Sequence, residues 1–165
     1  MADITIGGNP INTTGTIPQV GEKIKDFKLV APDMSIKSLA DYKGKKLVLN
    51  IFPSVGTGVC AKSVHGFNSA AGSKADTVVL NISKDLPFAQ KAFCGAEGLD
   101  NVEMLSDFRP NDFSANYNTV LLNGPFEGLH SRVVIVADAE GNVMYSEQVP
   151  EIGQEPNYDA ALSSL

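Results

Sequence analysis

The sequence has no tryptophan, few histidines and few cysteines, and its apolar runs are short. No run approaches the roughly 20 apolar residues of a membrane-spanning helix, so we expect no transmembrane segment and no role in a membrane. The cysteines, Cys60 and Cys94, form no Cys-x-x-Cys pair, and only His65 and His130 accompany them. That set is too sparse for a typical zinc site, and we expect neither a metal nor another cofactor.

Basic residues are also scarce, and they are spread along the chain. Thirteen Lys and Arg stand against 19 Asp and Glu, which gives a net charge of −6. Nucleic-acid binding needs a clustered basic face, so we expect no nucleic-acid partner. With 43% hydrophobic and 19% charged residues, the composition is that of an ordinary folded protein. The length and the lack of a long linker predict a single domain over residues 1–165.

The first 18 residues contain neither the basic region nor the apolar region of a signal peptide. We therefore expect a cytoplasmic protein. In a reducing cytosol, two cysteines are poor candidates for a permanent structural disulfide. Cys60 and Cys94 then have a redox role or none.

The pattern of apolar residues predicts a central β-sheet with helices on its faces. The N-terminal stretch DITIGGNPI alternates around a Gly-Gly-Asn-Pro turn, which is typical of a β-hairpin that resumes at Ile11. Near-continuous apolar runs predict buried strands, and an alternating run after the turn DAEGN predicts an antiparallel edge strand. The buried strands are expected over 45–52, 76–83 and 132–138, and the edge strand over 141–149.

Helices are predicted between and after these strands. Residues 60–71 place Val64, Phe67 and Ala71 on one apolar face, although Gly66 weakens the helix by propensity. Residues 85–98 have Asp85 as an expected N-cap, Pro87 in the first turn and Gly95 as an expected stop. Two short segments complete the set: a helical turn ending at Gly44 and a terminal helix in EPNYDAALSSL.

This arrangement places Cys60 just beyond the carboxyl end of a central strand, at the start of a helix. A helix N-terminus favours the thiolate, the nucleophilic form of cysteine. A mostly ionised thiol at neutral pH needs about 3–4 kcal/mol of differential stabilisation. A helix end supplies about 0.3–1 kcal/mol. A cation and hydrogen-bond donors must add the rest.

Several residues can meet that need. Thr57 lies one turn before Cys60, so we expect its hydroxyl to turn toward the sulfur. Pro53 begins a tight loop with two glycines. Arg132 opens a buried strand, where an unpaired charge is costly, so it is the first candidate cation. Arg109 is the second, and Lys62 is the weakest because it is expected to face solvent. Taken singly, a cysteine after a strand is more often a core thiol than a catalytic one. Thr57 alone is compatible with a helix cap, and Arg132 with a surface charge.

The combination Pro53-x-x-x-Thr57-x-x-Cys60 resembles the active-site pattern of the peroxiredoxins. Further stretches resemble the bacterial thiol peroxidase subgroup, the atypical two-cysteine peroxiredoxins, over nearly the whole chain. These are LNIFPSVGTGVCAKSV, ISKDLPFAQKAFCGAEGL, GPFEGLHSRVVIVAD and EIGQEPNYDAALSSL. The resemblance implies a thioredoxin-like α/β fold with a central mixed sheet flanked by helices and an N-terminal β-hairpin.

The resemblance also implies a function and a set of site residues. Cys60 matches the peroxidatic cysteine, Cys94 the resolving cysteine, and Thr57, Pro53 and Arg132 the other active-site positions. The implied activity is the reduction of hydrogen peroxide and organic hydroperoxides through an intramolecular disulfide, in a homodimer recycled by thioredoxin.

Two positions depart from the family pattern. Gly56 replaces a usual Asp, and His65-Gly66 replaces Arg-Lys, which changes the charge expected around the site.

Residues 121–129, with Phe52, Val55 and Phe93, are expected to line an apolar entrance that favours organic hydroperoxides. Two other functions remain open on the same residues. One is a thiol oxidoreductase or redox sensor without fast peroxide turnover, which the lack of Cys-x-x-Cys disfavours. The other is a binding module with inert cysteines.

Overall fold

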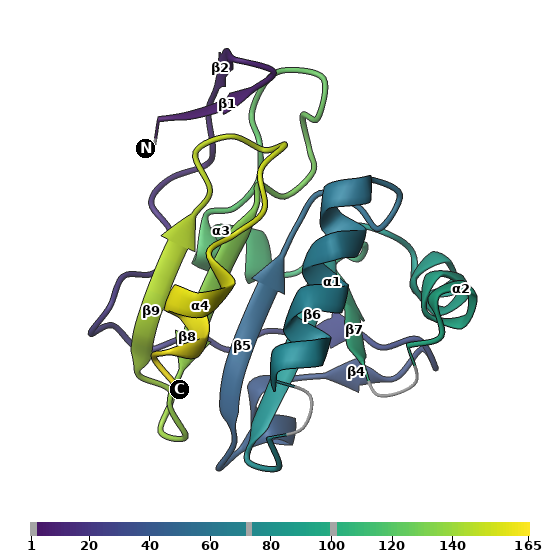
Figure 1. Ribbon diagram of the computed structural model, residues 1–165, viewed down its shortest axis with the longest axis vertical. Coiled ribbons are helices and arrows are strands. Elements are labelled where there is room, and N and C mark those ends of the chain that lie inside the picture. The colour runs from purple at the N-terminus through teal and green to yellow at the C-terminus, as the bar shows by residue number, and fades with distance from the viewer. Residues whose placement is uncertain (1–2, 72–73, 100–101) are drawn as a thin grey trace.

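A computed structural model describes residues 3–71, 74–99 and 102–165. The strands are β1 (Ile4–Ile6), β2 (Asn9–Ile11), β3 (Leu29–Val30), β4 (Ile36–Lys37), β5 (Lys46–Ile51), β6 (Thr77–Ser83), β7 (Glu103–Ser106), β8 (Val133–Ala137) and β9 (Val143–Gln148). The helices are the 3₁₀ turn η1 (Leu39–Tyr42), α1 (Gly58–Ala71), α2 (Pro87–Glu97), α3 (Phe113–Tyr117) and α4 (Tyr158–Leu162). β1 and β2 form a hairpin at one end of a mixed seven-stranded sheet (Figure 1).

The sheet has the order β4-β3-β7-β6-β5-β8-β9. β5, β6 and β7 run parallel, whereas β8 pairs with β5, and β9 with β8, in the antiparallel sense. Alternate side chains of β5 enter different cores: Leu49 and Ile51 lie in one apolar cluster and Val48 in another. Burial on both faces explains why this strand reads as a continuous apolar run. The predicted buried strands and the antiparallel edge strand are confirmed.

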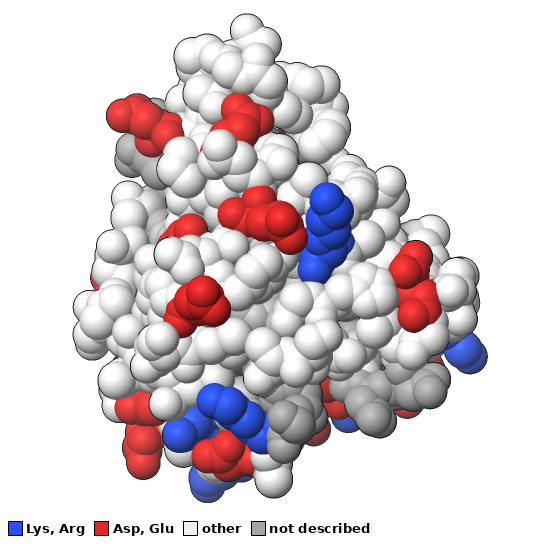
Figure 2. Space-filling view, viewed as in Figure 1, with Lys and Arg blue, Asp and Glu red and all other residues white. Residues whose placement is uncertain are grey.

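The helices cover both faces of the sheet. α1 and α4 pack together on one face, where Phe67 and Ala161 share a cluster with β5 and β8. Phe113 and Tyr117 of α3 belong to the cluster on the other face, and Figure 1 shows α3 behind the sheet. On the face that carries α1 and α4, Figure 2 shows Lys and Arg in small separate groups among acidic and uncharged side chains.

The N-terminal hairpin forms with a tighter turn than the sequence predicted. Only Gly7 and Gly8 make the turn, with φ of 57° and 80°, and β2 resumes at Asn9 rather than at Ile11. Two successive residues of positive φ are typical of the two-residue turns that match the twist of a hairpin. Pro10 is tolerated because, among the described residues, this strand pairs only with β1.

Two details predicted for α2 are wrong. The N-cap is Leu86 rather than Asp85, and no side chain caps this helix end. The helix also continues past Gly95, because the left-handed residue that ends it is Gly98, with φ of 67°. Pro87 does occupy the first turn, and Cys94 does lie in the last.

The sequence analysis did not identify β4, β7 or α3. Each has two to five residues. Such segments carry too little periodicity to be recognised alone. β7 becomes a strand because it pairs with β6 on one side and β3 on the other.

Gly66 has a packing role in α1. A Cβ atom there would lie 2.8 Å from Cε1 of Tyr158, the α4 residue whose ring meets Phe67 edge-on. Replacing glycine by alanine normally stabilises a helix by roughly 1 kcal/mol. We expect Gly66→Ala instead to destabilise the protein by about 1–3 kcal/mol, because the new methyl group overpacks this contact. Thermal unfolding measures the change.

The control is Gly95→Ala, since a Cβ atom at Gly95 meets nothing within 4 Å. This variant should raise the melting temperature by about 2–4 °C. A similar rise for Gly66→Ala would contradict the packing role.

Candidate active site

Cys60 lies where the sequence analysis expected it, but it is fully buried. β5 ends at Ile51, a loop follows, and Cys60 is the third residue of α1. The side chain has 0% relative exposure and packs in an apolar cluster with Phe52, Val64 and Met104. The sulfur is therefore not in contact with solvent in this arrangement.

Thr57 caps α1. Its Oγ1 accepts a hydrogen bond from the backbone N–H of Cys60 at 3.4 Å, and its hydroxyl donates to the Ser54 carbonyl at 3.2 Å. The expectation that this hydroxyl turns toward the sulfur is not met in this arrangement. The side chain instead fixes the first turn of the helix that carries Cys60.

Arg132 is brought directly to the sulfur. Its Nη2 lies 3.4 Å from the Cys60 Sγ, and its Nε donates to the Ile152 carbonyl at 3.0 Å. The side chain is only 1% exposed, and its Nη1 has no hydrogen-bond partner among the described residues. Within that part of the chain, no carboxylate lies within 4 Å of the guanidinium. The guanidinium is therefore a buried cation in direct contact with the Cys60 sulfur.

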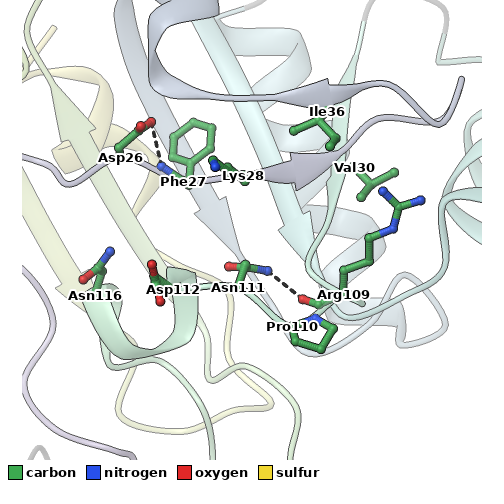
Figure 3. Close-up of a pocket in the computed structure, with 10 residues that line it drawn as sticks. All are labelled: Asp26, Phe27, Lys28, Val30, Ile36, Arg109, Pro110, Asn111, Asp112 and Asn116. Carbon is green, nitrogen blue, oxygen red and sulfur yellow. Dashed lines mark hydrogen bonds between the residues drawn. The ribbon is translucent and has the colours of Figure 1, made fainter.

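The other two candidate cations are not part of this arrangement. Arg109 is exposed and lines a separate cavity of about 440 Å³. Figure 3 shows Arg109 beside Val30 at one end of this cavity and Asn116 at the other. Lys62 is exposed on α1, as expected.

Cys94 lies in the same apolar cluster as Cys60, although it belongs to α2. Both cysteines are free thiols in this structure. Cys94 is half-buried, and this burial raises the pKa of its thiol. The fold thus brings both cysteines to one cluster while they remain on separate helices.

The remaining sequence-predicted positions lie around this centre. Pro53 is buried in the loop before α1, and Gly56 is exposed, with its N–H donating to the Ser54 hydroxyl. His65 contacts α2, where its Nε2 lies 2.9 Å from Oε2 of Glu97. The departure expected at His65 from the resemblance therefore lies at a contact between helices.

A cavity of about 320 Å³, which we call the entrance cavity, opens beside Thr57 and Arg132. Its lining is mostly apolar and comes from the hairpin, the start of α1 and two loops. The lining residues are Ile6, Gly7, Thr57, Gly58, Val59, Phe126, Arg132, Glu151, Ile152 and Gly153.

Phe126 belongs to the stretch 121–129 that was expected here. Phe52, Val55 and Phe93 do not line the cavity and pack around the two cysteines instead. Ile6 and Ile152 were missed, because only tertiary packing brings them to this place.

Glu151 fastens the hairpin over the entrance cavity. Its carboxylate accepts hydrogen bonds from the Thr5 hydroxyl at 2.6 Å and from the N–H groups of Gly7 and Gly8 at 3.0 and 3.2 Å. These bonds, led by that of Thr5, lower the pKa of Glu151 from 4.5 to about 2. These donors lie at the other end of the chain, so no local pattern in the sequence marks Glu151, and the sequence analysis missed this residue.

This shift predicts how acid affects the hairpin. Because the folded pKa lies below the ordinary value, the contribution of Glu151 to stability is complete above about pH 4.5. It is lost as the pH falls toward about 2. We expect amide hydrogen exchange of residues 4–11, corrected for intrinsic rates, to accelerate over this range. In Glu151→Gln the exchange should be faster already at pH 6 and should change less with acid. An unchanged hairpin in this variant would contradict the role of the carboxylate.

The described residues contain no group of three or more His, Cys, Asp or Glu arranged to hold a metal ion. None of their helices has the length and apolarity needed to span a membrane.

Comparison with known proteins agrees with this geometry. The Redoxin family model matches residues 19–162. Thiol peroxidases of Mycobacterium tuberculosis and Mycobacterium bovis are each 51% identical over 165 residues, covering 100% of this chain and 99% of their own length.

Solved structures agree as well. A peroxiredoxin-like protein from Aquifex aeolicus superposes with a TM-score of 0.92 at 33% identity, covering 99% of this chain and 95% of its own. A thiol peroxidase from Chromobacterium violaceum, 22% identical, shares the fold with a TM-score of 0.86 over 97% of this chain and 93% of its own. The chain therefore has the thioredoxin-like redoxin fold and belongs to the thiol peroxidase subgroup of the peroxiredoxins.

Proposed function

We propose that this protein is a thiol-dependent peroxidase in which Cys60 reacts with hydroperoxides and Cys94 resolves the product. The observation that carries the proposal is the contact between Arg132 and Cys60. A guanidinium that is 1% exposed, with no carboxylate beside it in the described chain, touches the sulfur at 3.4 Å. A neutral core thiol does not compensate the charge of a buried guanidinium, whereas a thiolate does.

In the first step, the Cys60 thiolate attacks one oxygen of the hydroperoxide. The O–O bond breaks, the sulfur is oxidised by two electrons to a sulfenic acid, and the other oxygen leaves with the electron pair. After taking up a proton, it becomes water or an alcohol. The free Nη1 of Arg132 is available to stabilise the charge on the leaving oxygen. Thr57 holds the helix end in place, and buried Pro53 shields the sulfenic acid from water.

In the second step, the Cys94 thiol attacks the sulfenic sulfur. An S–S bond forms and water leaves, which protects Cys60 from further oxidation. The cysteines lie on different ordered helices, so we propose that the structure around both loosens locally while the bond forms. A dithiol reductant must then reduce the disulfide. We propose thioredoxin for this role and a cytoplasmic homodimer as the working form.

The entrance cavity supports organic hydroperoxides as substrates alongside hydrogen peroxide. Ile6, Phe126 and Ile152 offer apolar surface beside Arg132. An alkyl group buried there gains about 1–3 kcal/mol that hydrogen peroxide cannot gain. We expect a higher kcat/KM for an organic hydroperoxide than for hydrogen peroxide.

The variant Phe126→Ala tests this source of specificity. It should lower kcat/KM for cumene hydroperoxide by about tenfold and change the value for hydrogen peroxide little. Leu122→Ala is the control, because Leu122 is 50% exposed and does not line the cavity. If hydrogen peroxide proves the better substrate by tenfold, the cavity is not the source of specificity.

The overall function is tested by peroxide consumption and non-reducing mass spectrometry. The reduced protein should consume one equivalent of hydroperoxide rapidly and lose two hydrogens at monomer mass, through a bond between Cys60 and Cys94. With thioredoxin and its reductase, consumption should continue. A slow reaction with formation of the same bond would favour a redox sensor. Unreactive cysteines would favour a binding module, and a covalent dimer would indicate an intermolecular resolving step.

A further inference from the structure

Asp85 bonds to the loop that precedes Cys60 instead of capping its own helix. Its Oδ1 accepts a hydrogen bond from the Ser54 hydroxyl at 2.7 Å. Its Oδ2 accepts from the Val55 N–H at 2.9 Å and from the Ser83 hydroxyl at 2.6 Å. The carboxylate is partly buried, and its three donors are neutral hydroxyl and N–H groups. Hydrogen bonds from neutral donors to a carboxylate are stronger than those between two neutral groups. Asp85 therefore holds the β5–α1 loop against the end of β6.

The same group of bonds reaches the helix of Cys94. Gln90, which is fully buried, donates through Nε2 to the Ser83 hydroxyl oxygen at 3.1 Å and to the Leu105 carbonyl at 3.0 Å. Gln90 and Cys94 are four residues apart in α2, so they lie on the same side of that helix. A continuous set of hydrogen bonds thus runs from the loop before Cys60, through Asp85 and Ser83, to the helix that carries Cys94.

A further bond fixes Asp85 itself. The Ser106 hydroxyl at the end of β7 donates to the Asp85 carbonyl. Ser54 is also tied to the active site on its other side, because its carbonyl accepts from the Thr57 hydroxyl that caps α1. Residues 54–57 thus link Asp85 to the first turn of α1.

We propose that Asp85 is a positioning residue that latches the β5–α1 loop and α2 in the arrangement that reacts with peroxide, and that this latch opens for disulfide formation. The inference rests on the proposed roles of Cys60 and Cys94. The three bonds of the carboxylate stabilise only the latched arrangement, in which Cys60 contacts Arg132. Without them, the latched form is less populated and the loosened form is more populated. The two chemical steps must then respond in opposite directions.

The test measures both steps in Asp85→Ala and Asp85→Asn by rapid quench and mass spectrometry. The peroxide step is followed on a Cys94→Ser background and the disulfide step in the protein with both cysteines. We expect Asp85→Ala to slow the peroxide step by about tenfold, the order expected for losing a hydrogen bond to a charged group. The disulfide step should accelerate several-fold, and less Cys60 should reach the sulfinic acid at high peroxide. Asp85→Asn, which keeps one acceptor oxygen, should lie between Asp85→Ala and wild type.

The control is Asp76→Ala at the opposite end of β6. Asp76 also bonds a hydroxyl, that of Thr77, and lies 3.5 Å from the Lys46 ammonium. Its removal should leave both rates unchanged. If Asp85→Ala does not fold, Asp85→Asn and Ser54→Ala, which removes one donor, provide the same comparison.

The outcomes separate this inference from the proposed function. Opposite changes in the two rates support the latch. Parallel decreases, or no change in either rate, overturn it, because a purely structural role predicts no faster disulfide step. If the wild-type protein itself forms no bond between Cys60 and Cys94, the proposed function fails first and the latch fails with it.

Discussion

Replacing Cys60 by serine is expected to abolish peroxidase activity, lowering kcat/KM by more than about a thousandfold, the order seen when a catalytic nucleophile is removed. The sulfur that this variant removes lies 3.4 Å from Nη2 of Arg132. A serine hydroxyl is not ionised at neutral pH and cannot replace the thiolate. The assay is peroxide consumption with thioredoxin as reductant, together with circular dichroism to confirm the fold.

Cys94→Ser should behave differently, because Cys94 acts only after the first oxidation. This variant should consume about one equivalent of peroxide at the wild-type rate and then stop, with Cys60 held as sulfenic acid or oxidised further. Mass spectrometry distinguishes these products. Equal multiple-turnover activity in the two variants would show that the roles assigned to the cysteines are wrong.

Removing Arg132 is expected to have the second largest effect. Arg132→Ala should slow the reaction of Cys60 with peroxide by about 10²–10³-fold, as when one donor is removed from a site that stabilises a developing anion. The loss has two parts: the thiolate loses its cation, and the leaving oxygen loses a donor. Thiolate absorbance against pH isolates the first part. The rate per thiolate, on a Cys94→Ser background, isolates the second.

The controls for this prediction are Arg132→Gln and Arg109→Ala. Glutamine keeps a hydrogen-bond donor but carries no charge. In Arg132→Gln the fraction of Cys60 present as thiolate should therefore fall more than the reaction rate per thiolate. Arg109 lines a different cavity, and its replacement should change neither quantity. Equal effects of Arg132→Ala and Arg109→Ala would mean that Arg132 does not act at the cysteine.

The sequence by itself determined the central strands and the position of Cys60. The strands β5, β6 and β8 are buried on both faces, and that burial leaves a continuous apolar run in the sequence. The apolar spacing of residues 60–71 predicts a helix soon after this first strand, and that prediction places Cys60 at a helix start. The choice of Arg132 over Arg109 also rested on a local feature, a charge at the beginning of a buried strand.

Only the tertiary structure decided what surrounds the cysteine. Asp85 looked like a helix cap because a short acidic side chain before Pro87 is typical of one. Its carboxylate instead accepts hydrogen bonds from a loop about 30 residues earlier in the chain. The same holds for Glu151, which bonds to residues at the other end of the chain. Local patterns report periodicity and propensity, whereas these bonds depend on which segments the sheet brings together. The entrance cavity and the connection between the two cysteine helices could therefore be found only in the folded chain.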